Sequence, residues 1–213
     1  ASCLVGSEMC IRDRLNLDMV VHNSDQFQIL KDNSFYNNLW LKINTGMNRL
    51  GFEIKEFLEI YDEHLHDKKF TLMTHLAASN DKDSLSNKNQ FKLFDDLSKK
   101  MNKDVDLSIA NTGCVMNFPE YTYDWVRCGI GIYGGYFKDQ EIKTAMTLRS
   151  PIVNIRQIKK GERVGYDGRA EAQDNMSIAT VYLGYADGLP LKIKDGTSVM
   201  INKQIAEVFG RVS

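Results

Sequence analysis

Short apolar runs alternate with amphipathic stretches along the first two thirds of the chain. The runs at 39–43, 70–73 and 105–110 have the length and apolar content typical of buried strands. An alternation of apolar and polar residues over 15–21 predicts one more strand ahead of them. Polar turn residues and then apolar residues at helical spacing follow these runs, which predicts βα units and a parallel sheet.

Two of the predicted helices carry a clear apolar stripe. The first begins near Glu53, and its stripe consists of Ile54, Phe57, Leu58, Tyr61 and Leu65. The second follows the polar segment 80–86, and its stripe consists of Phe91, Phe94, Leu97 and Met101. Ahead of both, Asn23 with Gln26 three residues later predicts the capped start of a helix that ends near Leu30.

The pattern changes after Lys138 to short extended segments separated by turns. Residues 147–158 and 178–185 are strand-like, 159–162 is a turn, and Asp195-Gly196 is a hairpin signal ahead of strands at 199–201 and 205–209. No amphipathic helix of convincing length is predicted there. We therefore expect a partial βα barrel domain at 15–140 and a truncated, β-rich C-terminal domain at 141–213.

Four polar residues stand at or just after the ends of successive predicted strands: Arg49, His75, Asn111 and Arg127. The C-terminal ends of the strands of a (β/α)8 barrel form one face, and that face holds the active site. Residues 15–135 are about half of the roughly 250 residues of a complete barrel. The fold class expected is α/β, a partial TIM-type barrel followed by a mostly β domain.

The ends of the chain indicate a fragment. Residues 1–14 lack the basic and apolar regions of a secretory signal and resemble translated adapter sequence, so we set them apart as a non-native leader. The last residues, 207–213, stop within a strand pattern. We expect the chain to be part of a longer protein.

Composition excludes several classes of protein. The net charge of −1 gives no electrostatic footprint for nucleic acid, and no apolar run approaches the roughly 20 residues of a membrane span. The four cysteines, at 3, 10, 114 and 128, have no paired spacing, so neither a disulfide framework nor a metal site is predicted. A reducing, cytoplasmic setting fits best.

The segment 129–134 matches the dinucleotide pattern G-x-G-x-x-G. That pattern holds a pyrophosphate only when an amphipathic helix follows the last glycine, and none is predicted after Gly134. We reject the dinucleotide interpretation. A narrower one remains: the backbone N–H groups near Gly129 can approach a phosphate closely because no Cβ intervenes.

Five ordered segments resemble motifs of the bacterial alanine racemases. Residues 42–51 resemble the signature K-x-D-T-G-M-x-R-L-G, and the others are 108–112 (A-N-S), 126–134 (V-R-x-G-I-x-x-Y-G), 161–166 (G-E-x-V-G-Y) and 184–188 (G-Y-A-D-G). The resemblance covers nearly all of 15–213. It implies an isomerase that interconverts L- and D-alanine for peptidoglycan through a pyridoxal phosphate aldimine.

The resemblance also implies roles for residues of the barrel. Arg127 would face the pyridine nitrogen of the cofactor, with His75 hydrogen-bonded behind it. Arg49 would contact the substrate carboxylate and the cofactor phenolate, steadied by Lys42, which is carboxylated in some members of the family. The cofactor phosphate would be held by Asn111, Thr112, Gly129 and Ile130.

In the C-terminal domain the resemblance implies that Tyr166 is the acid/base on one face of the substrate carbon. Tyr185, Asp187 and Arg211 would support it. It further implies a homodimer in which Tyr166 serves the partner's barrel.

Some positions depart from the family pattern. Asn44 stands where Asp is usual, Thr112 where Ser is usual, and Leu191 where Arg is common. None of the lysines stands in the K-A-x-A-Y-G-H-G setting of the Schiff-base lysine, so these residues alone are expected to be inactive. Two alternatives remain open: an amino-acid decarboxylase of the same barrel-plus-β architecture, and a non-catalytic pyridoxal phosphate-binding barrel.

Overall fold

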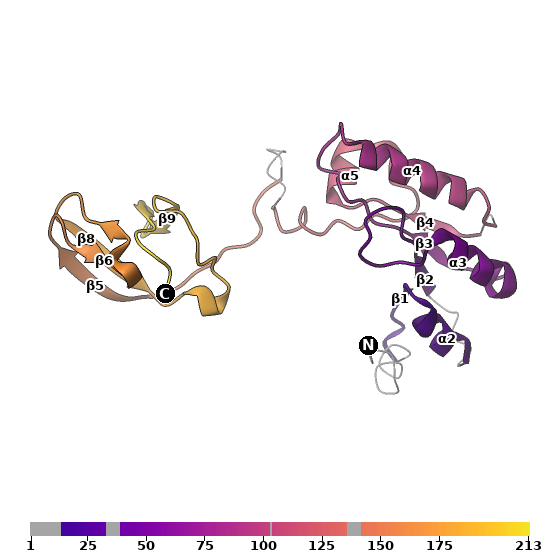
Figure 1. Ribbon diagram of the computed structural model, residues 1–213, viewed down its shortest axis with the longest axis horizontal. Coiled ribbons are helices and arrows are strands. Elements are labelled where there is room, and N and C mark those ends of the chain that lie inside the picture. The colour runs from indigo at the N-terminus through magenta and orange to yellow at the C-terminus, as the bar shows by residue number, and fades with distance from the viewer. Residues whose placement is uncertain (1–13, 33–38, 103, 136–141) are drawn as a thin grey trace. The chain divides into compact units, whose positions relative to one another are not determined.

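The computed structural model describes residues 14–32, 39–102, 104–135 and 142–213, and Figure 1 shows the course of the chain. The interpretation of the leader, with Cys3 and Cys10, lies almost entirely outside the described residues. The chain divides into two compact units, Ala1–Met146 and Thr147–Ser213, and each is described here by itself.

The first unit is built on a four-stranded parallel sheet. Its strands are β1 (Met19–Val21), β2 (Leu39–Lys42), β3 (Thr71–Met73) and β4 (Asp106–Ser108), and they lie side by side in chain order. Leu41 in β2 lies opposite Val21 on one side and Leu72 on the other. Parallel strands in chain order, with helical crossovers between them, form part of a (β/α)8 barrel, so the predicted fold class is confirmed.

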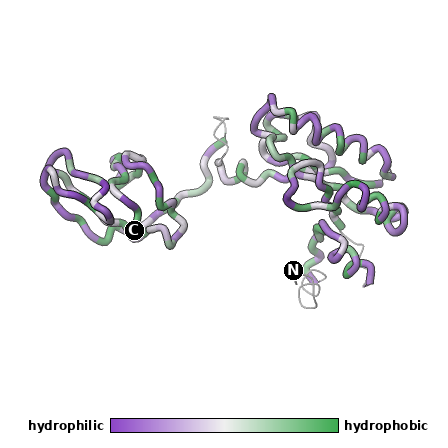
Figure 2. Tube along the Cα trace, viewed as in Figure 1, coloured by the Kyte–Doolittle hydropathy of each residue, from purple (hydrophilic) through white to green (hydrophobic). Residues whose placement is uncertain are grey.

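Helices cover one face of this sheet. They are α2 (Ser24–Asp32), α3 (Ile54–Ile60) with its π-helical extension η1 (Tyr61–Leu65), α4 (Leu85–Ser98), and α5 (Thr112–Asn117), which is followed by the 3₁₀ turn η2 (Pro119–Tyr121). The predicted stripes face inward: Phe57 and Phe94 are fully buried in the same core cluster as Leu41 and Leu72. Hydrophilic and hydrophobic residues recur in turn along α4 (Figure 2). Burying each such side chain contributes about 1.5–3 kcal/mol.

The first predicted strand is too long. Only Met19–Val21 of the expected segment 15–21 pairs in the sheet. Asn16 has a φ of 48°, a left-handed conformation that interrupts an extended backbone. The predicted helix cap after this strand is confirmed, because the Asn23 side chain accepts a hydrogen bond of 2.9 Å from the N–H of Gln26.

The second unit consists of three antiparallel strand pairs. Strand β5 (Ile152–Ile158) pairs with β8 (Met176–Val181), and β6 (Arg163–Val164) pairs with β7 (Ala170–Glu171). Strands β9 (Ser198–Ile201) and β10 (Gln204–Glu207) form a hairpin. Two 3₁₀ turns, η3 (Tyr166–Gly168) and η4 (Tyr185–Asp187), are the only helical segments described in 147–213. The predicted β-rich character is confirmed.

The hairpin turn lies elsewhere than predicted. Asn202 and Lys203 form its tip, with φ angles of 48° and 67°, as a two-residue type I′ turn requires. Asp195-Gly196 instead lies at the base of the hairpin, where the N–H of Gly196 donates to the carbonyl of Val208 at 2.9 Å. Gly196, with its left-handed φ of 82°, therefore lies just before β9 begins and not in the turn that joins β9 to β10.

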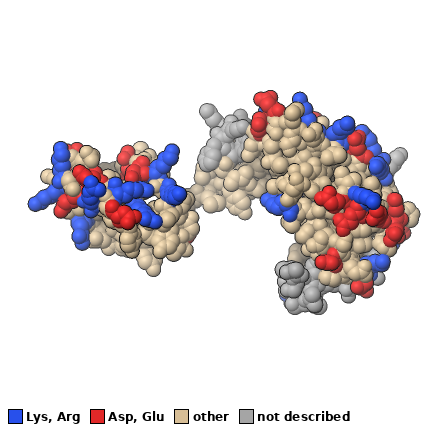
Figure 3. All heavy atoms as spheres, in the orientation of Figure 1, with Lys and Arg blue, Asp and Glu red and all other residues tan. Residues whose placement is uncertain are grey.

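Charges of both signs are interspersed on the visible face of each unit (Figure 3). This distribution agrees with the near-zero net charge and leaves no single-sign stripe on that face. Among the described residues, no helix is both long and apolar enough to cross a membrane.

Candidate active site

Arg127 is fixed at the C-terminal edge of the parallel sheet. Its N–H donates to the carbonyl of Ala110 at 2.8 Å, and it forms a parallel bridge with Asn111, so it continues the sheet beyond β4. The guanidinium donates to the Ser108 hydroxyl and to the Thr74 carbonyl, and it lies 3.4 Å from Nδ1 of His75. Three groups, from the end of β4 and from the segment after β3, therefore set the direction of the guanidinium.

His75 faces a cation and is neutral near pH 7. A guanidinium has only donors, so Nδ1 of His75 must be the acceptor toward Arg127 and the ring proton belongs on Nε2. Burial, and then the charges of Arg127, Lys42 and Arg49, lower the pKa of His75 to about 4. His75 and Arg127 therefore lie next to each other at this edge of the sheet, as predicted.

Ser108 is a site residue that the sequence analysis did not single out. Its hydroxyl is fully buried, donates to the Trp125 carbonyl at 2.9 Å and accepts from Arg127. Because the single proton of the hydroxyl is used toward Trp125, the oxygen presents a lone pair to the guanidinium. The sequence signal that could have identified Ser108 is its position at the end of β4, four residues before Thr112.

Lys42 and Arg49 complete a group of three cations, which we call the cation cluster (Lys42, Arg49 and Arg127). Burial lowers the pKa of Lys42, and the charges of Arg49 and Arg127 lower it further. Burial likewise lowers the pKa of Arg127 to about 10. Among the ion pairs of the described residues, none includes a member of this cluster.

The loop that carries Arg49 is organised by Asn44. Its side-chain oxygen accepts from the N–H groups of Gly46 and Asn48, at 3.1 and 3.0 Å, while its amide donates to the Glu53 carboxylate at 2.9 Å. An aspartate here would place a second carboxylate against Glu53. Asn44 therefore donates to Glu53 where the aspartate usual in the family would repel it.

The loop also needs its second glycine. Gly51 has a φ of 124°, and a Cβ there would lie 2.6 Å from the backbone of Ile43 and Asn44. Such a side chain would force apart the turn that returns the chain to Phe52.

Thr112 and the loop 129–134 form a second polar group beside the cations. The Thr112 hydroxyl accepts from the N–H of Gly131 at 3.1 Å, and a Cβ on Gly131 would approach the Thr112 methyl to 2.7 Å. A Cβ on Gly129 would meet nothing within 4 Å, so the backbone there is open. This is the arrangement expected where a phosphate approaches backbone N–H groups.

Asn111 has its side chain engaged within the protein. Its oxygen accepts from the Cys114 N–H at 3.1 Å, as the cap of α5, and from the Ser79 hydroxyl at 2.7 Å. Its amide donates to the Leu76 carbonyl at 3.4 Å. Asn111 thereby fixes the place of Thr112.

In the second unit, Tyr166, Tyr185, Leu191 and Arg211 line a cavity of about 480 Å³, together with Asp167 and Val212. Tyr166 is 66% exposed and stands in a turn that begins at Gly165, with a φ of 74°. Arg211 donates to the Asp167 carboxylate at 2.7 Å. The leucine at 191 makes part of this wall apolar.

Two further contacts hold the elements of this cavity. Asp187 accepts from the N–H of Gly184 at 2.9 Å and so closes the turn that carries Tyr185. The Tyr185 N–H donates to the Ser213 carbonyl at 3.2 Å. The motifs at 161–166 and 184–188 are thus adjacent, within this unit, to the segment 211–213.

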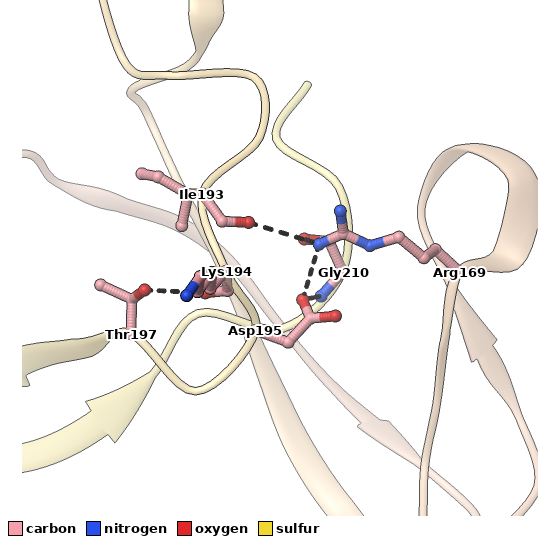
Figure 4. Close-up of polar contacts among 6 residues, drawn as sticks. All are labelled: Arg169, Ile193, Lys194, Asp195, Thr197 and Gly210. Carbon is pink, nitrogen blue, oxygen red and sulfur yellow. Dashed lines mark hydrogen bonds and ion pairs between the residues drawn. The ribbon is translucent and has the colours of Figure 1, made fainter.

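Arg169 holds the segment that carries Arg211 through a hydrogen bond to Gly210. Figure 4 shows its guanidinium donating to the Asp195 carboxylate at 2.9 Å and to the Gly210 carbonyl at 3.1 Å. Asp195 also accepts from the Gly210 N–H at 2.8 Å. The hydrogen bond from Arg169 lowers the pKa of Asp195. The network fixes the residue immediately before Arg211.

The cation cluster suits an anionic cofactor. Three permanent or near-permanent positive charges lie together without a carboxylate partner among the described residues, and desolvation already lowers the pKa values of two of them. A bound phenolate or carboxylate would relieve their mutual repulsion. The open backbone at Gly129 and the Thr112 hydroxyl, which still has a proton to donate, suit a phosphate.

Two domain models of one protein family match most of the chain. Residues 5–137 match the alanine racemase N-terminal domain, and residues 145–213 match the alanine racemase C-terminal domain. The chain belongs to the alanine racemase family. The first match begins inside the segment that we set apart as a leader.

Curated relatives in the alanine racemase family match nearly all of the chain. The alanine racemase of Pseudoalteromonas atlantica is 35% identical over an alignment of 225 positions, gaps included, that covers 99% of this chain and 60% of the relative. The alanine racemase of Coxiella burnetii is 35% identical over an alignment of 217 positions that covers 94% of this chain and 59% of the relative. The chain therefore spans about 60% of the length of these alanine racemases.

Solved alanine racemases have the same fold. The biosynthetic alanine racemase of Pseudomonas aeruginosa superposes with a TM-score of 0.82 at 29% identity, over 97% of this chain and 60% of that structure. The alanine racemase of Acinetobacter baumannii gives 0.78 at 29%, over 97% and 61%. The family recognised from five motifs in the sequence is confirmed.

The low pKa of His75 predicts a pH-dependent stability of the first unit. The unfolded chain binds a proton near pH 6.5 and the folded chain only near pH 4, so stability is complete above pH 6.5 and declines as the pH falls through this window. His75 is partly exposed, so we expect a loss of only about 1–2 kcal/mol.

Urea unfolding at pH 7.5 and 4.5 measures this loss. Trp40 and Trp125, the two tryptophans of the chain, both lie in the first unit, and their fluorescence follows its unfolding. His75→Asn keeps an acceptor toward Arg127 but does not titrate, so its free energy of unfolding should decline less. Equal declines in both proteins would show that His75 is not the group responsible.

Proposed function

We propose that this chain supplies most of the active site of an alanine racemase that works with pyridoxal 5'-phosphate. The observation that carries the proposal is the arrangement of Arg127, held by Ser108, Thr74 and His75 at the barrel edge without a carboxylate partner. The membership of the chain in the alanine racemase family also supports the proposal. A solved relative from Bartonella henselae carries covalently bound pyridoxal phosphate.

When bound, pyridoxal phosphate supplies an electron sink that stabilises negative charge on the substrate Cα. Arg127 would donate to the pyridine nitrogen. A guanidinium does not release its proton, so that nitrogen stays unprotonated and the sink is weaker than one paired with a carboxylic acid. A weak sink favours simple return of the proton to Cα. This distinguishes a racemase from the alternative decarboxylase.

The other unit-one residues would bind and orient. Thr112, with the backbone N–H groups of Gly129 and Ile130, would hold the phosphate, and Asn111 would act through its cap of the same segment. Arg49 would bind the substrate carboxylate, which would compensate one charge of the cation cluster. Lys42 would steady Arg49 after carboxylation of its amine, because a carbamate accepts hydrogen bonds from a guanidinium and an ammonium does not.

Tyr166 would exchange a proton with one face of the substrate Cα. Racemisation needs an acid/base on each face, and the family's Schiff-base lysine would serve the other. Tyr185, Asp187 and Arg211 would hold the Tyr166 turn in place. We propose a homodimer in which each Tyr166 completes the partner's barrel, with two equal sites related by two-fold symmetry. The cytoplasmic setting remains a prediction.

A titration with pyridoxal phosphate, followed by absorbance, tests the cofactor assignment on the chain as it is. Arg127→Ala should weaken binding by about tenfold or more, since it removes a charge-assisted hydrogen bond. Arg163→Ala is a matched control, because Arg163 is exposed, belongs to the second unit and pairs there with Glu171. Equal affinities of the two variants would contradict the assignment. D-Alanine formation by the complete reading frame tests the reaction itself.

A further inference from the structure

Gln90 lies on α4, outside every motif, and is 1% exposed. Its side-chain oxygen accepts from the N–H of Ala77 at 2.9 Å. Its amide nitrogen donates to the His75 carbonyl and to the Thr45 hydroxyl, each at 3.0 Å. Both donors and the acceptor of the side chain are therefore used, and they join the loop after β2 to the loop after β3.

Beyond Gln90, the hydroxyl groups of Thr45 and Thr74 form a series of hydrogen bonds in which each donor and acceptor is fixed. Thr74 donates its hydroxyl proton to the Ile43 carbonyl at 2.8 Å, so toward Thr45, 2.8 Å away, it can only accept. Thr45 must then donate to Thr74 and accept from Gln90. Thr45 and Thr74 are 3% and 1% exposed, so water does not compete for these bonds.

This series of hydrogen bonds ends at the cation cluster. The carbonyl of Thr74 accepts from the Arg127 guanidinium, and the next residue, His75, presents Nδ1 to it. Gln90 thus fixes the backbone on both sides of the two groups that direct Arg127. Thr45 lies in the same loop as Arg49, four residues earlier.

We infer that Gln90 is a positioning residue for the cofactor site: through Thr45, Thr74 and the His75 carbonyl it holds Arg127 and His75 in their mutual geometry. The proposal names the amide of Gln90, and not its bulk, as the active feature. A buried amide that satisfies three partners on two loops costs more to replace than its packing alone, because each partner is left without a bond.

The test compares Gln90→Met with Asn87→Leu in the 213-residue chain. Asn87 lies three residues earlier on α4, is equally buried, and donates to the carbonyls of Ala78 and Asp81 instead of the cluster. Both substitutions remove a buried amide of the same helix. Both should lower Tm, so thermal stability alone does not distinguish them.

The distinguishing measurement is the titration of the His75 imidazole by NMR, which needs no cofactor. Gln90→Met should raise the pKa of His75 by about one unit as the ring moves from Arg127 toward solvent, while Asn87→Leu leaves it unchanged. Pyridoxal phosphate affinity should fall about tenfold in Gln90→Met only, the loss typical of one misdirected hydrogen bond to a charged group. The second readout rests on the proposed function; the first does not.

Variants of Thr45 decide the outcome where Gln90→Met does not fold. Thr45→Val removes the hydroxyl at equal size and should raise the pKa of His75 in the same direction, whereas Thr45→Ser keeps the hydroxyl and should restore it. An unchanged His75 pKa in Thr45→Val, or equal effects of Gln90→Met and Asn87→Leu, would overturn the inference. Absence of cofactor binding to the unsubstituted chain would instead count against the proposed function.

Discussion

Tyr166→Phe is expected to slow racemisation by the complete protein by about 10²–10⁴, the usual contribution of one general acid or base. Phenylalanine keeps the ring in the turn at 165–168 and removes only the proton-carrying oxygen. Because the two faces of the substrate carbon have different bases, the substitution should also affect the two enantiomers of alanine unequally. One enantiomer of alanine should still exchange its α-hydrogen with solvent, and the other should not.

Exchange of the α-hydrogen in deuterated water, followed by NMR for each enantiomer, measures this inequality. Tyr182→Phe is the matched control, since Tyr182 is an exposed tyrosine of the same unit that does not line the cavity. Loss of exchange for both enantiomers alike would mean that Tyr166 acts on binding rather than on one proton.

The proposed dimer makes a further consequence of the same substitution measurable. A heterodimer of a Tyr166→Phe chain with a chain that lacks the Schiff-base lysine should contain one intact site, and so recover activity that neither parent homodimer has. Recovery identifies Tyr166 as acting on the partner's barrel. No recovery from a verified heterodimer would place its action within its own chain.

Expressed alone, the 213 residues are expected to bind pyridoxal phosphate reversibly and to produce no D-alanine. The cation cluster and the Thr112 region provide binding, but covalent catalysis by this cofactor needs a positioned lysine amine. Lys42 is the lysine of the cluster, and we propose that it supports Arg49 instead. A polypeptide that supplies the lysine strand should restore turnover by several orders of magnitude.

Borohydride reduction followed by peptide mass spectrometry checks this prediction at a stoichiometric amount of cofactor. Reduced adduct spread at trace levels over exposed lysines is the expected pattern, with Lys55, 92% exposed in its side chain, as an internal reference. Selective labelling of Lys42, with turnover by the chain alone, would refute the prediction.

The sequence was sufficient for the sheet and for the edge that carries the site. Buried strands such as 39–42 are recognisable from their apolar content, and residues that end parallel strands share an edge whatever their separation in sequence. That is why their positions in the sequence group Arg49, His75 and Arg127, and the charges of both arginines act on His75 in the structure. The family motifs then supplied roles that position alone does not define.

Gln90 and Ser108 escaped prediction for a physical reason. Their partners lie 13 to 45 residues away for Gln90 and 17 to 19 for Ser108, and no local pattern encodes such hydrogen bonds. A glutamine in an amphipathic helix is ordinarily solvated. The tip of the last hairpin was missed because Asn202-Lys203 lacks the glycine by which type I′ turns are usually recognised.

The close approach of Gly131 to Thr112 couples the choice of residue at these two positions of the chain. It is the extra methyl of threonine that a Cβ at 131 would meet at 2.7 Å, whereas the hydroxyl oxygen would lie at 3.2 Å. With serine at 112, alanine at 131 would need only a small adjustment; with threonine at 112, it would collide. The two positions are therefore coupled: Gly131→Ala should destabilise the chain that carries Thr112 more than the same chain with Thr112→Ser.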